Sequence, residues 1–205
     1  MLQSAIATGE LLPGRKLVID ALARQLQVSI TPVREALMRL QREGLVTEVP
    51  YSGMHVSKLS TTELRELFSL RGLLEGYAVR LAADGLTASD LEAIRTDLEL
   101  MEEASEQGDQ PRFREINMRF HTAILSAAGG TALQELIGQL TRNTERYRNV
   151  ADHTFDRDYL KAAQVEHRLL FSLLEQRRGE EAELLARKHA LTFVAYMSRH
   201  LEAWR

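Results

Sequence analysis

The sequence contains no cysteine, which excludes disulfide bonds and thiolate metal ligands. No apolar run approaches the roughly 18 residues that a membrane-spanning helix needs. The N-terminus also lacks the basic region followed by an apolar segment that marks an export signal. Aromatic residues make up only 6% of the chain and hydrophobic residues 44%, as in an ordinary soluble globular protein. We therefore expect a cytoplasmic protein with no membrane partner.

The chain has no large excess of charge of either sign. A net charge of −3 over 205 residues argues against a non-specific nucleic-acid binder. Residues 1–57 carry six Lys or Arg against five Asp or Glu, a balance of about +1, so the rest of the chain is acidic. A segment this weakly basic would make few phosphate contacts, and DNA binding would then need two copies on one DNA.

Residues 20–46 show two short amphipathic helical patterns separated by a tight turn. Asp20 is the expected N-cap of the first helix, and the second has Thr31 as its cap, Pro32 in its first turn and Gly44 at its end. The outward side of the second helix is polar and basic near its N-terminus, as in a recognition helix that enters the major groove. The residues expected to contact DNA there are Ser29, Thr31, Pro32 and Arg34.

The next segment, LVTEVPYSGMHV at 45–56, predicts a β-hairpin with turn residues at its tip. Helix, turn, helix and hairpin in this order predict a winged helix, and Ser52 and Gly53 at the tip are further candidate DNA contacts. With a short first helix over residues 1–8, residues 1–57 are predicted to be a winged helix-turn-helix domain. Its expected partner is a double-stranded DNA operator.

From residue 58 onward the pattern contains helices only. Ser60 with Glu63 forms a capping box, and Thr87 with Asp90 starts the second helix. Residues 58–205 are therefore predicted to form an antiparallel six-helix bundle, and the fold class is mostly α. In the first bundle helix the residues expected to face the core are Leu64, Leu67, Leu70, Leu74, Ala78 and Leu81.

Three histidines lie on the predicted inner faces of three bundle helices: His121, His167 and His189. A lone histidine on such a face is more often a hydrogen-bonded core residue. Burying three imidazoles at one level without a shared partner would cost desolvation several times over, whereas one divalent cation would satisfy all of them. The alternative that they bind an anionic effector directly, or bind nothing, remains open.

The segment from Gly9 to Val56 resembles the DNA-binding domain of the GntR family of bacterial transcription regulators. The family commonly has arginine between the turn serine and the threonine, where this chain has Ile30, and the difference removes a phosphate or guanine contact. The residues that carry the resemblance are GELLPGRKL at 9–17, LARQLQVS at 22–29, TPVREAL at 31–37, LQREGLV at 40–46, and Gly53 with Val56.

From Thr61 onward the chain is similar to the all-helical FCD effector domain of the FadR subfamily, and its six helices resemble the shorter, VanR-like branch. The matching segments are LRGLLEGYAVRLAA at 70–83, NMRFHTAI at 117–124, EHRLLFSLL at 166–174 and ARKHALTF at 186–193. In metal-binding members the ligands are an aspartate, a histidine four residues later and two further histidines. The resemblance therefore implies a metal site formed by Asn117, His121, His167 and His189.

The nature of these side chains indicates which ion the site would take. Three neutral imidazoles suit zinc, nickel or another late first-row divalent ion. Asn117 is neutral where the family has aspartate, so the ion would keep its full positive charge. Open coordination positions would be left for water or for the carboxylate of an effector.

Arg71 on the first bundle helix allows two interpretations. It forms a salt bridge to Glu75 one turn later, or it clamps the carboxylate of a small organic acid, because a guanidinium holds a carboxylate through two hydrogen bonds. In the second case Arg71 and Asn117 are the candidate effector-binding residues.

The predicted function is a ligand-responsive transcription regulator that binds its operator as a homodimer, with the effector changing the spacing of the two DNA-binding heads. A metal enzyme is disfavoured, because the chain lacks the paired Glu-x-x-His motifs of di-iron bundles and an obvious general base. A helical sensor or dimeric scaffold with impaired DNA binding remains the alternative, on account of Ile30 and the short first helix.

Overall fold

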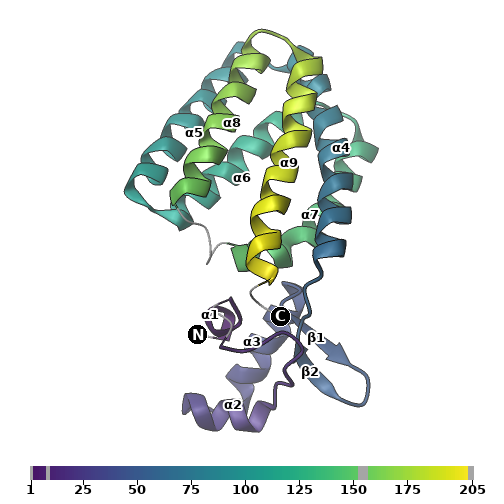
Figure 1. The fold of residues 1–205 in the computed structure, drawn as a ribbon, viewed down its shortest axis with the longest axis vertical. Coiled ribbons are helices and arrows are strands. Elements are labelled where there is room, and N and C mark those ends of the chain that lie inside the picture. The colour runs from purple at the N-terminus through teal and green to yellow at the C-terminus, as the bar shows by residue number, and fades with distance from the viewer. Residues whose placement is uncertain (1, 8–9, 152–156, 203–205) are drawn as a thin grey trace. The chain divides into compact units, whose positions relative to one another are not determined.

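The computed structural model describes residues 2–7, 10–151 and 157–202, and within these ranges the chain is mostly helical with one small sheet (Figure 1). The first elements are α1 (Leu2–Ala7), α2 (Ile19–Leu26), α3 (Ile30–Arg42), β1 (Val46–Val49) and β2 (Gly53–Val56). Six helices follow: α4 (Thr61–Gly85), α5 (Ala88–Gln107), α6 (Gln110–Ala127), α7 (Thr131–Ala151), α8 (Arg157–Glu175) and α9 (Gly179–Glu202). No described helix is long and apolar enough to cross a membrane. The predicted fold class is confirmed.

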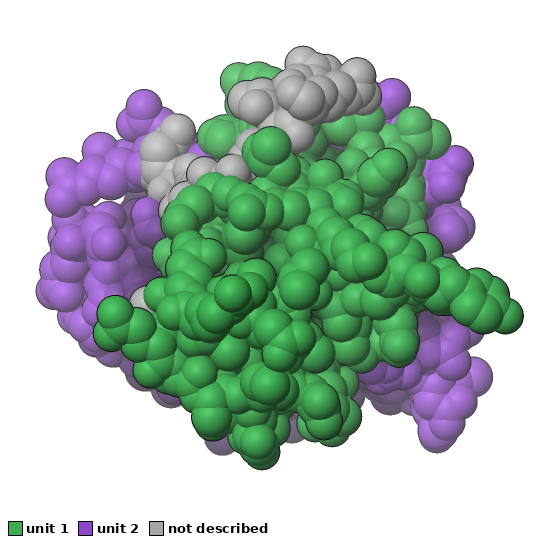
Figure 2. Space-filling view, turned by 90° about the horizontal axis from the view of Figure 1, so that it is seen from below, with its two compact units in different colours: residues 1–64, 143–154, 197–205 green, residues 65–142, 155–196 purple. Residues whose placement is uncertain are grey.

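The chain divides into two compact units, which Figure 2 shows in two colours. Unit 1 consists of residues 1–64, 143–154 and 197–205, and unit 2 of residues 65–142 and 155–196. Unit 1 thus contains the predicted DNA-binding segment together with the C-terminal ends of α7 and α9. A domain boundary after residue 57 stays a prediction.

In unit 1, α2 and α3 bury their apolar faces as the periodicity predicts. Both helices nevertheless begin earlier than expected: Val18 is the N-cap of α2 and Ser29 the N-cap of α3, so Asp20 and Thr31 lie inside the first turns. Neither N-cap side chain makes a capping hydrogen bond within the described structure, so side-chain capping does not fix these boundaries. The packed residues are Leu22, Ala23, Val33, Leu37 and Leu40.

The hairpin pairs Val46 with Val56 and Val49 with Gly53 in an antiparallel register. At its tip Gly53 has φ +90°, a conformation that glycine adopts without strain. A short segment before α2 adds to the other edge of β2, where Lys16 forms a bridge with His55. The two-stranded sheet is therefore extended at this edge by one isolated bridge.

The start of α4 differs from the predicted capping box. Ser60 Oγ accepts a hydrogen bond from the Glu63 backbone N–H at 3.3 Å. The reciprocal bond is replaced by Tyr147 of α7, whose hydroxyl donates to Glu63 Oε2 at 2.7 Å and accepts from the Ser60 N–H at 3.3 Å. Burial and the hydrogen bond to Glu63 raise the pKa of Tyr147 to about 12, so its hydroxyl stays protonated.

The inner face of α4 is only partly the predicted one. Leu64 and Ala78 are buried, but Leu70 and Leu81 are 52% and 38% exposed. The apolar side chains of α4 are distributed around most of its circumference, so periodicity alone does not determine which side of the helix faces the core. Close packing on α9 determines it instead, because a Cβ at Gly76 would lie 3.0 Å from the Glu183 carbonyl oxygen. The residues buried in their place are Phe68, Val79, Ala82 and Ala83.

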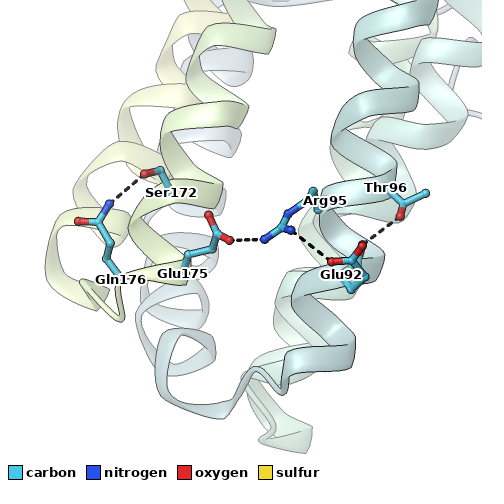
Figure 3. Close-up of polar contacts among 6 residues, drawn as sticks. All are labelled: Glu92, Arg95, Thr96, Ser172, Glu175 and Gln176. Atoms are coloured by element: carbon cyan, nitrogen blue, oxygen red, sulfur yellow. Dashed lines mark hydrogen bonds and ion pairs between the residues drawn. The ribbon is translucent and has the colours of Figure 1, made fainter.

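Two helices of unit 2, α5 and α6, begin where local capping predicts. Thr87 forms a complete capping box with Asp90 at α5, and the Asp109 side chain caps α6. Between α5 and α8, the Arg95 guanidinium bonds Glu175 at 2.5 Å, and Figure 3 shows the two side chains meeting between the helices. These surface contacts lie outside a continuous core to which α4, α5, α6, α8 and α9 all contribute.

Candidate functional site

Three imidazoles from three helices of unit 2 converge on one point. His121 comes from α6, His167 from α8 and His189 from α9, and one ligating atom of each lies within 4.8 Å of those of the other two. Their ring centroids are 4.7 to 5.4 Å apart. Helical periodicity placed each histidine on an inner face, and the packing of the helices brings all three together.

His167 is buried and is held by a neighbouring amide. Gln164, one turn earlier on α8, donates its Nε2–H to the Leu98 carbonyl oxygen of α5 at 2.8 Å. Its Oε1 then faces His167 Nδ1 at 3.5 Å, so the imidazole donates from Nδ1 and leaves Nε2 as the nitrogen with a lone pair. This tautomer is the one required of a metal ligand that binds through Nε2.

His189 has a stronger partner of the same kind. Its Nδ1 lies 2.7 Å from Glu166 Oε2, and Thr192 donates its hydroxyl to Glu166 Oε1 at 3.0 Å. Burial raises the pKa of the Glu166 carboxyl, but the hydrogen bond and attraction from His189 and the hydrogen bond from Thr192 lower it by more, so the pKa lies below its usual value. The carboxylate can only accept, so His189 donates from Nδ1, and Nε2 is the ring nitrogen that this contact leaves available to a metal ion.

Asn117, the fourth predicted ligand, lies one turn before His121 on the same face of α6. Its Oδ1 atom is buried and accepts no hydrogen bond from any residue that the structure describes. A buried oxygen without a hydrogen bond lowers the stability of the folded protein by about 1–3 kcal/mol. A cation bound next to this oxygen would offset that loss. The three clustered imidazoles, with an amide oxygen one helical turn from His121, are donors of the kind that a late first-row divalent ion takes.

Arg71 adopts the first of its two predicted arrangements. Its guanidinium is buried, with 5% of the residue exposed, and its Nε lies 2.7 Å from Glu75 Oε1. Glu75 also lines a cavity of about 20 Å³ beside the histidines, a volume that holds roughly one water molecule. The other lining residues are Val79, His121, Ile124, Leu125, Leu170, Ala186 and His189.

The predicted DNA contacts in α3 share one exposed end of that helix. Ser29, Thr31, Pro32 and Arg34 are all exposed. The Ser29 hydroxyl makes no capping bond among the described residues. Ile30, the first residue of α3, is 44% exposed on the same end, where its apolar side chain offers no hydrogen bond.

The wing tip contains an internal contact that the sequence did not reveal. His55 donates from Nδ1 to the Gly53 carbonyl oxygen at 2.9 Å, and its Nε2 lies 3.2 Å from Ser52 Oγ. Tyr51 stands fully exposed beside them. Of the two predicted contacts here, Ser52 is thus held by His55, while Gly53 has open space on its Cα.

Sequence reasoning also missed the groups that orient the imidazoles. Glu166 and His189 lie on different helices and 23 residues apart, so no helical spacing connects them. The only available signal was the position of Glu166, which directly precedes His167. Gln164 gives a local signal, since it lies three residues before His167, but a glutamine at that spacing is equally compatible with a solvated face.

Comparison with known families identifies the architecture. The family described as "Bacterial regulatory proteins, gntR family" matches residues 1–56, and the FCD domain matches residues 66–192. The chain belongs to the gntR family and carries an FCD domain. The resemblance inferred from the sequence is confirmed, and the family consists of transcriptional regulators, not enzymes.

Individual gntR-family relatives support this assignment. The HTH-type transcriptional regulator McbR of Escherichia coli (strain K12) is 37% identical over 139 residues, which cover 68% of this chain and 63% of McbR, less than two thirds of its length. The HTH-type transcriptional repressor RspR of the same strain is 28% identical over 178 residues, 86% of this chain and 77% of RspR. A solved structure described as "E. coli McbR/YncC" superimposes with a TM-score of 0.70 at 29% identity, covering 97% of this chain and 94% of that one.

Proposed function

We propose that this gntR-family regulator binds operator DNA as a homodimer and that its FCD domain binds a divalent late first-row metal ion, zinc or nickel, and a small carboxylate effector. The observation that carries the proposal is the convergence of His121, His167 and His189 within 4.8 Å. Asn117, whose buried Oδ1 accepts no hydrogen bond from the described residues, would supply the fourth donor. When bound, the ion would supply a full positive charge and open positions for an anionic ligand.

The carboxylate effector would have to enlarge the space beside the histidines. The cavity of about 20 Å³ admits roughly one water molecule. The Arg71 guanidinium is already paired with the Glu75 carboxylate. An incoming acid would therefore have to compete with Glu75 for Arg71, or use a coordination position that the protein ligands leave open on the ion. Either event would alter the packing of α4 in unit 2, and an effector shifts a conformational equilibrium only through such a difference in contacts.

The homodimer is supported by an exposed apolar row on α4. Leu70, Leu73, Tyr77 and Leu81 follow one another at intervals of three and four residues and lie 38% to 52% exposed. Monomeric proteins rarely expose such a row, and a second copy of the same helix would cover it. Two heads on one operator would also compensate for the weak positive charge of each.

DNA binding is tested with a fragment of the region upstream of the chain's own coding sequence. We expect wild-type protein to retard the fragment and Arg34→Ala to weaken the binding by roughly 5–100-fold, the loss typical of one base-contacting arginine. Arg42→Ala is the matched control, because Arg42 is exposed at the other end of α3. If no fragment is bound at any salt concentration, the alternative of a helical sensor or scaffold without sequence-specific DNA binding takes its place.

Metal binding is tested by elemental analysis of protein purified without chelator. We expect about one zinc or nickel ion per chain, and a loss of that ion in His167→Ala. The same substitution should abolish the rise in melting temperature that added metal causes, since an ion bound only to the folded state stabilises it. Protein that neither retains nor rebinds an ion would contradict the metal centre.

A further inference from the structure

We propose that Glu166 is a positioning residue of the metal centre, acting through His189 to fix its tautomer and to supply the negative charge that Asn117 does not. The inference rests on the proposed metal site. It assigns to that site a charged residue that contacts one of the ligands and not the ion. It is carried by the contacts that surround His189 and by the chemistry of the four predicted ligands.

The first step is the orientation of His189. Glu166 Oε2 lies 2.7 Å from His189 Nδ1, a distance typical of a charge-assisted hydrogen bond. The carboxylate accepts and the imidazole donates, so the ring is oriented with its proton on Nδ1 toward Glu166 and with Nε2 as the nitrogen left for the ion. An imidazole held in this way loses less entropy on binding a metal and is a more basic ligand.

The second step is that Glu166 is itself fixed. Thr192 lies one turn beyond His189 on α9 and donates its hydroxyl to the second carboxylate oxygen, Oε1, at 3.0 Å. The Glu166 side chain is only 14% exposed. Both carboxylate oxygens are therefore engaged by α9, and limited contact with water strengthens the electrostatic effect of the charge on its neighbours.

The third step concerns charge. The four predicted ligands are neutral, one amide oxygen and three imidazoles, and Gln164 beside His167 is neutral as well. Glu166 places a full negative charge in direct contact with a ligating imidazole. The imidazole of His189 would separate this charge from the ion, whereas an aspartate ligand would place its charge directly on the ion.

The test is the zinc affinity of the full-length protein, measured by competition with a chromophoric chelator. We expect Glu166→Gln to lower the affinity by 10–100-fold, because glutamine keeps an acceptor for His189 but lacks the charge. Thr192→Val removes only the hydroxyl that holds the carboxylate and should cause a smaller loss in the same direction. Glu180→Gln, an equal change of charge at an exposed position of α9, is the matched control and should bind zinc like the wild type.

A rescue experiment separates this role from a structural one. Adding Asn117→Asp to Glu166→Gln restores a carboxylate to the site and should recover affinity, which a mere packing role of Glu166 would not predict. Wild-type affinity in Glu166→Gln would overturn the inference alone. Absence of zinc binding by the wild-type protein would overturn the metal centre together with it. If Glu166→Gln fails to fold, as judged by the melting temperature without metal, the affinity of Thr192→Val decides.

Discussion

The side chain of Asn117 buries an oxygen atom, Oδ1, that has no hydrogen-bond partner among the described residues. An apolar side chain of similar size would bury no polar atom at this position. A buried oxygen without a partner lowers the stability of the folded chain and persists where a ligand uses it. The oxygen therefore has opposite expected effects in the metal-free and the metal-bound protein.

Asn117→Leu should separate these two effects. In metal-free protein we expect the free energy of unfolding to rise by about 1 kcal/mol, because the unsatisfied oxygen is removed. With saturating zinc the variant should gain less stability from the ion than the wild type does, since one donor is lost. Chemical unfolding with and without zinc measures both quantities. A metal-free variant less stable than the wild type would show that the oxygen is satisfied in the folded protein.

At the scale of single residues, the sequence predicted that three histidines face the interior of the bundle but not which groups orient them. His121, His167 and His189 were recognisable because helical periodicity determines which face a residue occupies. The partner of His189 depends on how separate helices pack, because Glu166 meets His189 only through the contact of α8 with α9. The ion pair of Arg71 with Glu75 was predictable, because the two residues lie one turn apart on one helix.

Single elements were predictable where a local interaction sets their ends. Thr87 accepts a hydrogen bond from the Asp90 N–H at 3.2 Å, and Asp90 Oδ2 accepts from the Thr87 N–H at 2.9 Å, so four adjacent residues fix the start of α5. The face of α4 was not predictable in the same way, because leucines occur around its circumference. Its orientation depends on Gly76, which lets the helix approach α9 closely.

The cap of α5 gives a pH-dependent prediction. Hydrogen bonds from the Thr87 hydroxyl and N–H lower the pKa of Asp90 below its ordinary value. A carboxyl whose pKa is lowered in the folded state stabilises that state above its unfolded pKa, and the contribution is lost as the pH falls through the folded pKa. The cap should therefore stabilise the protein at neutral pH and weaken below about pH 4.

We expect Thr87→Ala to destabilise the protein by about 1 kcal/mol at pH 7, and by less at pH 3, which lies below the ordinary pKa of an aspartate carboxyl. Ser89→Ala is the matched control, since it removes a hydroxyl from the same turn without touching the cap. Urea unfolding at both pH values provides the measurement. An equal loss of stability at pH 7 and pH 3 would contradict the role of the Asp90 carboxylate.

At the scale of the whole molecule, a single chain leaves one apolar row of α4 exposed to solvent. The row formed by Leu70, Leu73, Tyr77 and Leu81 was expected in part to be core, and its exposure became evident only from the structure. Sequence periodicity identifies an apolar face but not whether the same chain or a second copy covers it. The DNA-binding head gives an independent reason for a second copy, because its net charge of about +1 supports few phosphate contacts.

Leu73→Glu is the substitution that should separate the two copies. Leu73 is 47% exposed within one chain, so a glutamate there leaves the fold of the monomer intact but places a charge in the proposed interface. We expect light scattering after size exclusion to give the mass of a dimer for the wild type and of a monomer for the variant. Retardation of operator DNA should weaken by at least 10-fold, because a single head loses the advantage of two linked contacts.

Leu169→Glu on α8, where the leucine is 51% exposed, introduces the same charge away from α4 and should leave both measurements unchanged. A Leu73→Glu protein that remains dimeric would place the interface elsewhere, and a Leu169→Glu protein that becomes monomeric would place it on α8.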